Sequence, residues 1–426
     1  MRIIRPIASV LLLLAANLPV GRAASPLTWP DCVQQARENH PGLLAAQQSV
    51  EAAQAGIRAA RAGHLPQLSA SGRASYADDS KTGGGEESYQ GALDVSQSLY
   101  DGGSTRAAVR SAEAEWAVAL AEARQTGADI LYDVRIAYAD LLYAQFQIGL
   151  LEQIRLRRAD NVEMVELRYL GGQENQGSLA LNQASLREAE MDLAQARRAL
   201  QTAQSVLARA MGLAGAHPEL VVSGEFADVQ EPGAEEVESL IQATPAYAKA
   251  KAALERAEAG VQSARSGYRP TASVYGAAAR YGAAIDMEED SLSAGVRLTL
   301  PLWEGGRIGA EVRQAAARKA VVQADLTDVA NTQHTSLDKA LQAYREAGEN
   351  VTVQQQFASA QELRAAIARE QYANGLLKFD NWDIIENDLI SRQKSLLETR
   401  RQALLAEAAW WRVTGLGVDE TSGERP

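Results

Sequence analysis

The sequence predicts a mixed α and β fold in which one large unit occurs twice. Three observations predict it. Short motifs recur at an offset of about 203 residues. Two segments alternate apolar and polar residues as β-hairpins do, and a long stretch free of proline follows each of them. Aromatic residues make up only 5% of the chain, which favours extended helix packing over one large compact core.

The first 24 residues have the pattern of an export signal. Arg2 and Arg5 precede an apolar stretch from Ile7 to Leu18, and small residues follow at 21–24. This stretch is shorter than the roughly 20 residues that a membrane-spanning helix needs, and no other segment approaches that length. We therefore expect an exported chain without a transmembrane helix.

The bulk composition excludes some classes of protein. The net charge of −12 argues against nucleic-acid binding, which needs a basic surface. The single cysteine, Cys32, cannot form a disulfide within the chain. A small, partly buried residue is the expected role for Cys32, and a lipid anchor is the alternative.

The internal repeat defines two units, at 25–234 and 235–417, with a flexible tail at 418–426. Four separate motifs keep nearly the same offset and the same order along the chain. The matching segments are 62–66 with 266–270, 99–103 with 302–306, 169–172 with 372–375, and 211–213 with 414–416. A linker at 214–234 is expected to form a small side domain between the units.

Each unit begins with a helix and continues with two strands. In the first unit Asp31 is expected to cap a helix over Cys32–Gly63, which Pro66 ends. Alternation then predicts strands within 66–100, joined by a polar loop over 78–87. The second unit has the corresponding strands within 270–301, joined by a loop over 284–290. Strands of about 10 to 13 residues can cross a bilayer when tilted. A soluble hairpin with one buried face is the alternative.

A long helix and a shorter return helix complete each unit. The long helices are expected over 104–170 and 307–372, and each would be about 100 Å long. The return helices are expected over 178–213 and 381–415. A leading helix and a return helix together match the length of the long helix. The two short helices would therefore lie end to end beside the long one.

The four strands of one chain cannot close a membrane barrel. The smallest barrels have about eight strands. An open sheet in lipid would leave unpaired backbone groups, each costing several kcal/mol. Several copies must therefore share one barrel, and the sequence itself does not fix their number.

The order of these elements resembles that of the TolC family of outer-membrane export factors. The motifs at 300–306, before the second long helix, and at 369–375, at its end, are similar to that family. The resemblance covers about residues 27–417. It implies a homotrimer whose twelve strands form an outer-membrane β-barrel that continues into a long periplasmic α-helical barrel. It also implies passive export, with a periplasmic adaptor protein and an inner-membrane pump as partners and no cofactor.

The same resemblance points to a candidate periplasmic gate. The segment 382–387 is similar to the start of the family's return helix, and this places Asp383 and Glu386 at the positions of the gate carboxylates. Their spacing of three residues puts both on one helix face, so three copies would form two rings of acids. Tyr372 and Lys378 are further gate candidates. The alternative is ordinary helix-start chemistry, because acids favour helix N-termini.

Two further groups of residues follow from the duct interpretation. Gly171, Gly172 and Gly375 are expected as turn residues at the tips where the adaptor docks. Arg73, Asp94 and Arg297 lie on the polar sides of their strands and are expected to face the barrel lumen.

No catalytic or metal-binding pattern is visible in the sequence. The histidines are scattered and none has metal-ligand spacing; they are His40, His64, His217 and His334. An outer-membrane exit duct for efflux or secretion is therefore the leading functional hypothesis. A periplasmic structural or adhesive coiled-coil protein with soluble hairpins is the alternative. The sequence identifies neither the cargo nor the particular adaptor and pump.

Overall fold

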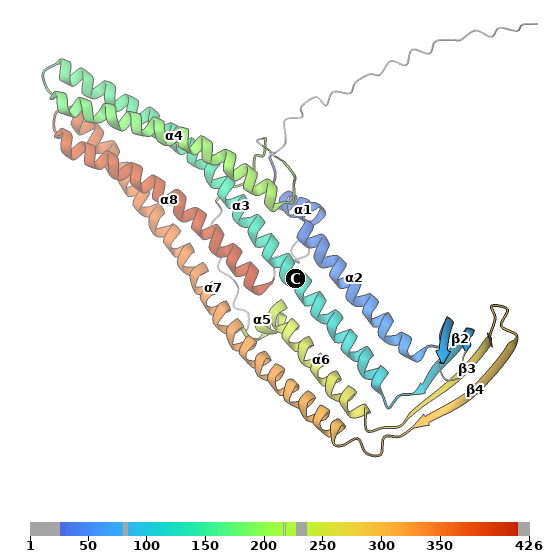
Figure 1. Cartoon of the computed structure of the whole chain (residues 1–426). Helices are drawn as coiled ribbons and strands as arrows, with labels where there is room; N and C mark the ends of the chain where they lie inside the picture. The colour runs from blue at the N-terminus through green and yellow to red at the C-terminus, as the bar shows by residue number, and fades with distance from the viewer. Residues whose placement is uncertain (1–25, 80–83, 216, 218, 227–236, 416–426) are drawn as a thin grey trace, which may run out of the picture.

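The chain folds into a long slab of helices with a four-stranded sheet at one end (Figure 1). The computed structural model describes residues 26–79, 84–215, 217, 219–226 and 237–415. The expected export signal and C-terminal tail lie outside these residues. Among the described helices, none combines the length and apolar composition needed to cross a membrane.

The repeat is visible in the order of the elements. The first unit contains α1 (Trp29–Asn39), α2 (Pro41–Arg61), the short 3₁₀ turn η1 (Ala62–His64), β1 (Gln67–Asp79), β2 (Gly84–Tyr100), α3 (Ser104–Leu170) and α4 (Gln176–Ala210). The second contains α5 (Val237–Ala243), α6 (Pro245–Ser266), β3 (Thr271–Gly282), β4 (Glu289–Thr299), α7 (Arg307–Ala373) and α8 (Phe379–Thr414).

The leading segment is two helices rather than the single helix expected over Cys32–Gly63. Pro41 lacks an N–H group and starts α2, and the ring of His40 accepts a hydrogen bond from Gly42 N at 3.1 Å. The N-cap of α1 is Thr28, and Asp31 completes its capping box instead of being the cap itself. The second unit breaks in the same way, since α6 begins at Pro245 after the short α5.

Short helices lie along long ones throughout the slab. Helices α1, α2 and α4, with 11, 21 and 35 residues, run beside α3, which has 67. Helix α7 also has 67 residues and is flanked by α6 and α8. Each long helix starts after two glycines with positive φ. At Gly102 a side chain would also clash, because an added Cβ would lie 2.8 Å from the Ser266 carbonyl oxygen.

The four strands form one antiparallel sheet in the order β1-β2-β3-β4. The prediction of a polar loop over 78–87 is wrong for most of that range. The segment instead continues the two strands, because β1 and β2 stay paired out to Asp79 and Gly84. Polar residues there belong to the strands, since backbone pairing does not require apolar side chains. Strand β2 accordingly has 17 residues, which is more than the length expected.

The main core lies at mid-height, where the two ends of the described chain meet α3. Cys32 is fully buried there, and Leu27 forms a parallel bridge with Val222 from the linker. The guanidinium of Arg135 lies 4.7 Å from the Trp29 ring and 5.1 Å from the Trp411 ring. It also donates to Glu407 at 2.8 Å. This arrangement joins α1, α3 and α8 into one body.

Candidate functional site: the helix tip and the faces of the sheet

Two tight turns form the end of the slab farthest from the sheet, which we call the helix tip (Figure 1). Gly172 (φ +71°) follows α3 and Gly375 (φ +75°) follows α7. In both turns, the N–H groups of the glycine and of the next residue bond back to helix carbonyl oxygens at 2.8–3.0 Å. The backbone therefore favours glycine at these two positions. Gly171 has a φ of −77°, which any residue can adopt.

Three aromatic rings close the tip of the α7–α8 pair. The Tyr372 and Trp382 rings are stacked with centroids 4.3 Å apart, and Phe379 meets both edge-on. Tyr372 and Trp382 are both fully buried, and Val165 of α3 belongs to the same apolar cluster. The cluster therefore holds the second unit's tip against the first unit.

Tyr372 also connects the two units through polar contacts. Its hydroxyl donates to Oε2 of Glu174 at 3.1 Å, and Glu174 lies in the turn between α3 and α4. The guanidinium of Arg168 lies 4.7 Å from the Tyr372 ring and donates to the Tyr372 carbonyl oxygen at 2.8 Å. Burial, followed by the nearby charge of Glu174, raises the pKa of Tyr372, so the hydroxyl stays protonated and able to donate.

A buried ion pair lies one helical turn beyond Trp382 along α8. Glu386 is fully buried, and Arg157 of α3 donates to both of its oxygens at 2.7 and 3.0 Å. Asn161 adds a longer hydrogen bond at 3.4 Å. The hydrogen bond to Glu386 raises the pKa of Arg157, so this guanidinium remains charged. A bidentate pair of this kind fixes both distance and angle between α3 and α8.

Asp383 lies beside this pair but is only partly buried. Its carboxylate accepts from Asn387 at 2.9 Å, and Asn387 in turn accepts from the buried Arg158. Burial raises the pKa of Asp383, and the charge of Arg158 opposes this shift. Asp383 therefore belongs to a polar network that links α3 and α8.

The structure brings three of the four gate candidates together at the tip. Tyr372 and Glu386 contact residues of the first unit directly. Asp383 accepts from Asn387, which is itself bonded to Arg158 of the first unit. Glu386 differs from its expected placement, because Arg157 covers its carboxylate and leaves no free charge for a ring of acids. Lys378 is the exposed N-cap of α8, and its side chain has no recorded partner among the described residues.

Sequence reasoning missed the residues that these candidates contact, namely Glu174, Arg157 and Arg168. The partners are about 200 positions apart in the chain, so no local spacing connects them. The repeat offset was the sequence feature that could have indicated these partners. The two units run side by side, so residues about one offset apart lie at the same height, as Arg168 and Tyr372 do.

The register of the sheet places the three lumen candidates on one face. Arg73 pairs with Gln90, Asp94 pairs with Ser69 and Ala277, and Arg297 pairs with Ser273. Alternation along each strand then puts Arg73, Asp94 and Arg297 on the same side. Arg297 also stacks over the ring of Tyr275 with 5.3 Å to its centroid.

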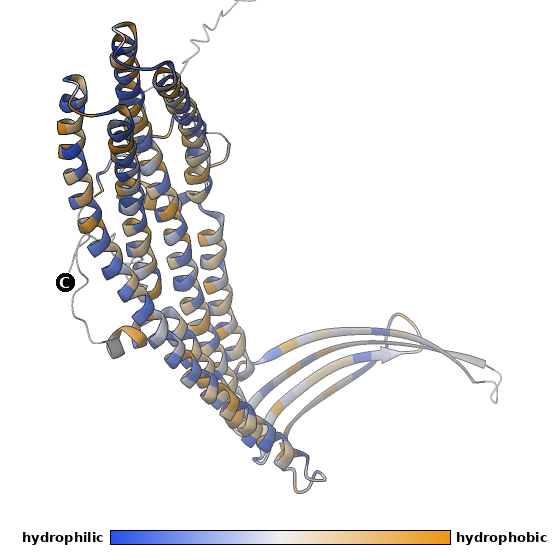
Figure 2. Cartoon of the chain, turned by 90° about the vertical axis from the view of Figure 1, so that its left-hand side faces the viewer, coloured by the Kyte–Doolittle hydropathy of each residue, from blue (hydrophilic) through white to orange (hydrophobic). Residues whose placement is uncertain are grey.

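The opposite face of the sheet is apolar and exposed, and Figure 2 shows the sheet extending away from the helices. Leu292 is 87% exposed and Leu298 is 72% exposed, so no other layer of the described residues covers either of them. The register aligns further apolar residues with them, namely Leu68, Ala70, Ala74, Leu93, Val95, Val274, Ala278, Ala294 and Val296. A contiguous exposed patch of this kind fits a lipid or protein environment better than water.

The fold, the two-faced sheet and the helix tip define a channel protein. The model of the outer membrane efflux protein family matches residues 32–213 and 237–416, and the chain belongs to this family. It is therefore an outer-membrane efflux channel with a large periplasmic part, as its resemblance to the TolC family implied. The family and the fold are those of channels rather than enzymes.

Individual relatives are distant in sequence but similar in fold. The outer membrane efflux protein BepC of Brucella suis biovar 1 (strain 1330) is 22% identical over 413 residues, covering 95% of this chain and 88% of BepC. The crystal structure of CusC matches with a TM-score of 0.81 at 18% identity, covering 91% of each chain. The open state of the MtrE outer membrane channel of Neisseria gonorrhoeae matches with a TM-score of 0.80 at 18% identity, covering 92% of this chain and 89% of MtrE.

Proposed function

We propose that three copies of this chain form the passive exit duct of a tripartite efflux system. The unpaired edges of the sheet are the observation that supports this proposal. Strands β1 and β4 are its edges, and neither has a partner along its outer side among the described residues. Unpaired strand edges are not tolerated in lipid, so β1 of one copy would pair with β4 of the next. Three copies would close a barrel of twelve strands.

The two faces of the sheet agree with this arrangement. The apolar face would meet lipid, and the face with Arg73, Asp94 and Arg297 would line the lumen. Members of the family are trimeric channels of tripartite systems, which implies a periplasmic adaptor and an inner-membrane pump as partners. In this proposal the duct is passive and the pump supplies the energy.

The helix tip would form the periplasmic gate. Its contacts connect the α3–α4 pair with the α7–α8 pair in this arrangement, and moving the pairs apart would break them. The bond from Tyr372 to Glu174 and the pair of Arg157 with Glu386 are the main connections. Asp383 is the gate acid that remains partly exposed, and Lys378 lies at the rim of the same opening.

The adaptor would dock on the two turns of the tip. Gly171, Gly172 and Gly375 are exposed there, and Leu170 and Leu376 present apolar side chains beside them. Positive φ at Gly172 and Gly375 keeps the two turns tight.

Fractionation and electrical recording test the proposal. The protein should be recovered with the outer membrane, migrate as a heat-modifiable trimer, and conduct ions in planar bilayers without added nucleotide. A product released as a soluble monomer from the periplasm would refute the duct and favour a structural coiled-coil protein with soluble hairpins.

A further inference from the structure

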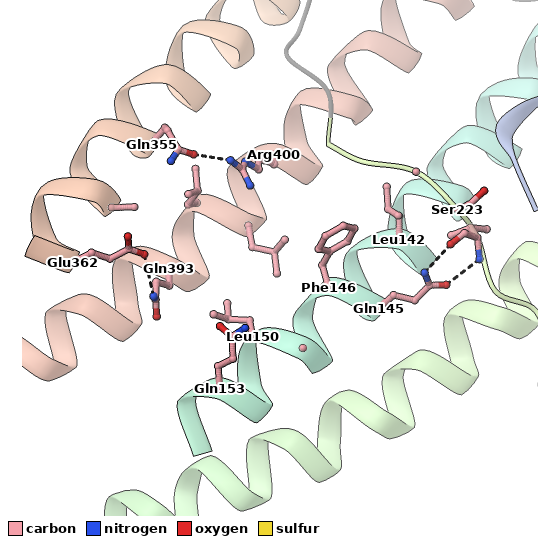
Figure 3. Close-up of a pocket in the computed structure, with 16 residues that line it drawn as sticks. Leu142, Gln145, Phe146, Leu150, Gln153, Ser223, Gln355, Glu362, Gln393 and Arg400 are labelled. Carbon is pink, nitrogen blue, oxygen red and sulfur yellow. Dashed lines mark hydrogen bonds between the residues drawn. The ribbon is translucent and has the colours of Figure 1, made fainter. Parts of the chain in front are cut away.

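We propose that a cavity between α3 and the α7–α8 pair binds an uncharged small molecule with a flat apolar ring and hydrogen-bonding groups (Figure 3). The cavity has a volume of about 620 Å³. Cavities that hold drug-sized ligands span roughly 300–1,000 Å³. It lies between the core at mid-height and the Arg157–Glu386 pair, and its lining includes no residue assigned to the proposed gate.

One part of the cavity lining is apolar. Phe146 is 43% exposed and meets Phe226 edge-on, with ring centroids 5.3 Å apart. Leucines from α3 and α8 extend this surface, namely Leu142, Leu150, Leu396 and Leu397. A flat ring placed against Phe146 would find apolar contacts from two helices, which favours an aromatic or similarly planar ligand.

A glycine in the middle of α3 leaves room for such a ligand. Gly149 lines the cavity, and a Cβ added there would meet no atom within 4 Å. Glycine is unfavourable inside helices, and neither a positive φ nor a close contact requires it at this position. The missing side chain instead widens the cavity beside Phe146.

The remaining lining offers both donors and acceptors. Arg400 donates to Gln355 at 2.6 Å, and Gln393 donates to Glu362 at 3.2 Å. These bonds leave the Gln355 amide nitrogen and the second Glu362 oxygen without a hydrogen-bond partner among the described residues. The charged side chains of the lining are Glu362 and Arg400, and their charges cancel. The polar side therefore suits amide or hydroxyl groups on a ligand without net charge.

The wall of the cavity nearest the linker is held by hydrogen bonds within the chain. The side chain of Gln145 makes two hydrogen bonds with the backbone of Val222, at 2.9 and 3.0 Å. The Tyr138 hydroxyl donates to the carbonyl oxygen of Ser223. A preformed wall lowers the entropy that binding would otherwise lose.

A ligand in this cavity would contact α3 on one side and α7 and α8 on the other. Its binding would therefore favour the arrangement in which the two helix pairs lie at their present separation. This consequence rests on the proposed function, in which the pairs move apart when the tip opens. Occupancy would then keep the duct closed for longer.

Binding of chloramphenicol, an uncharged aromatic amide with two hydroxyl groups, tests the site. The full-length trimer in detergent should bind it with a Kd below about 1 mM, measured by isothermal titration calorimetry. Gly149→Leu places a side chain in the open space and should weaken binding at least tenfold. Gly260→Leu is the matched control, because Gly260 is an uncrowded glycine in α6 outside the cavity. It should bind like the natural chain.

Planar-bilayer recording separates the site from its consequence. Chloramphenicol should lengthen closed periods of the natural channel and have little effect on Gly149→Leu. No binding, or equal binding by Gly149→Leu and the natural chain, would overturn the site. Binding without a change in closed periods would overturn the coupling to the tip. A chain that conducts no ions even without chloramphenicol would instead contradict the proposed function.

Discussion

Replacing Glu386 by alanine is the sharpest perturbation of the proposed gate. The substitution would remove both hydrogen bonds that Arg157 makes at 2.7 and 3.0 Å and would leave its guanidinium without a hydrogen-bonded carboxylate, although Glu362 and Asp160 remain as nearby charges. Breaking a buried pair in this way costs about 3–5 kcal/mol. The Arg157 side chain is still 28% exposed, so water can replace part of the lost interaction and the lower end, about 3 kcal/mol, applies.

That free energy converts into a change in gating. If opening the tip breaks the pair, about 3 kcal/mol per copy corresponds to a roughly hundredfold rise in the ratio of open to closed tips, since 1.4 kcal/mol is tenfold. Glu386→Gln keeps an oxygen that can accept and should open less than Glu386→Ala. Single-channel recording of the trimer in planar bilayers measures both the open probability and the conductance.

Asp388→Ala provides the matched control on the same helix. Asp388 lies 3.9 Å from Arg364, and both side chains are more than half exposed. An exposed pair of this kind contributes at most about 1 kcal/mol, so its loss should hardly change gating. An intact Glu386→Ala trimer with the open probability of the natural chain would refute the gate assignment. An equal effect of Asp388→Ala would show that general destabilisation, rather than the buried pair, opens the tip.

The remaining predictions address the other parts of the duct. Tyr372→Phe removes the donor to Glu174, a hydrogen bond to a charged group worth about 1.5–3 kcal/mol, and should raise the ratio of open to closed channels in bilayers by about 10- to 100-fold. Burial raises the pKa of Asp383 above its ordinary value of 3.8, so just above that pH the folded chain binds more protons than the unfolded chain, and the stability contributed by this group falls as pH rises through that window. Asp383→Asn should remove this fall, as seen in thermal unfolding at about pH 4 and about pH 7, and an unchanged pH dependence would contradict it. Gly375→Val places a β-branched residue at φ +75° and should weaken adaptor binding in pull-down assays, whereas full binding would exclude this turn from the docking surface. Val296→Lys on the apolar face should cost about 2–4 kcal/mol and reduce the amount of trimer in the outer membrane, whereas Arg297→Gln on the other face should change ion selectivity instead.

The long helices were predictable because glycines mark their ends and neither helix contains proline. Helix α3 spans Ser104–Leu170, the range expected from the sequence, since paired glycines precede it and a glycine turn follows it. The break at Pro41 was missed because the apolar pattern continues across it. Proline at the first position of a helix is compatible with that pattern, and only the chain direction changes.

The contacts at the tip were less predictable than the elements that carry them. Asp383 and Glu386 are three residues apart, but the structure buries one and leaves the other partly exposed. Helical spacing alone gives the angle between two side chains and not the neighbour that each one meets. That neighbour is α3, and the arginine at position 157 decides the environment of Glu386.

The two units also differ in how their tips are joined, and this difference bears on how the duct would open. Among the described residues, Arg157 and Glu386 form the ion pair between α3 and α8 that lies nearest the helix tip. In the proposed trimer, the repeat places Ala360 of α7 and Gln183 of the next copy's α4 at the equivalent positions, and neither carries a charge. At this height the contact within a chain would therefore contain a bidentate ion pair, whereas the equivalent positions of the contact between chains would not. Since an added ion pair raises the free energy needed to separate two helices only where it is present, the contacts between copies should part first, and each chain's two helix pairs should separate only after Glu386 is released.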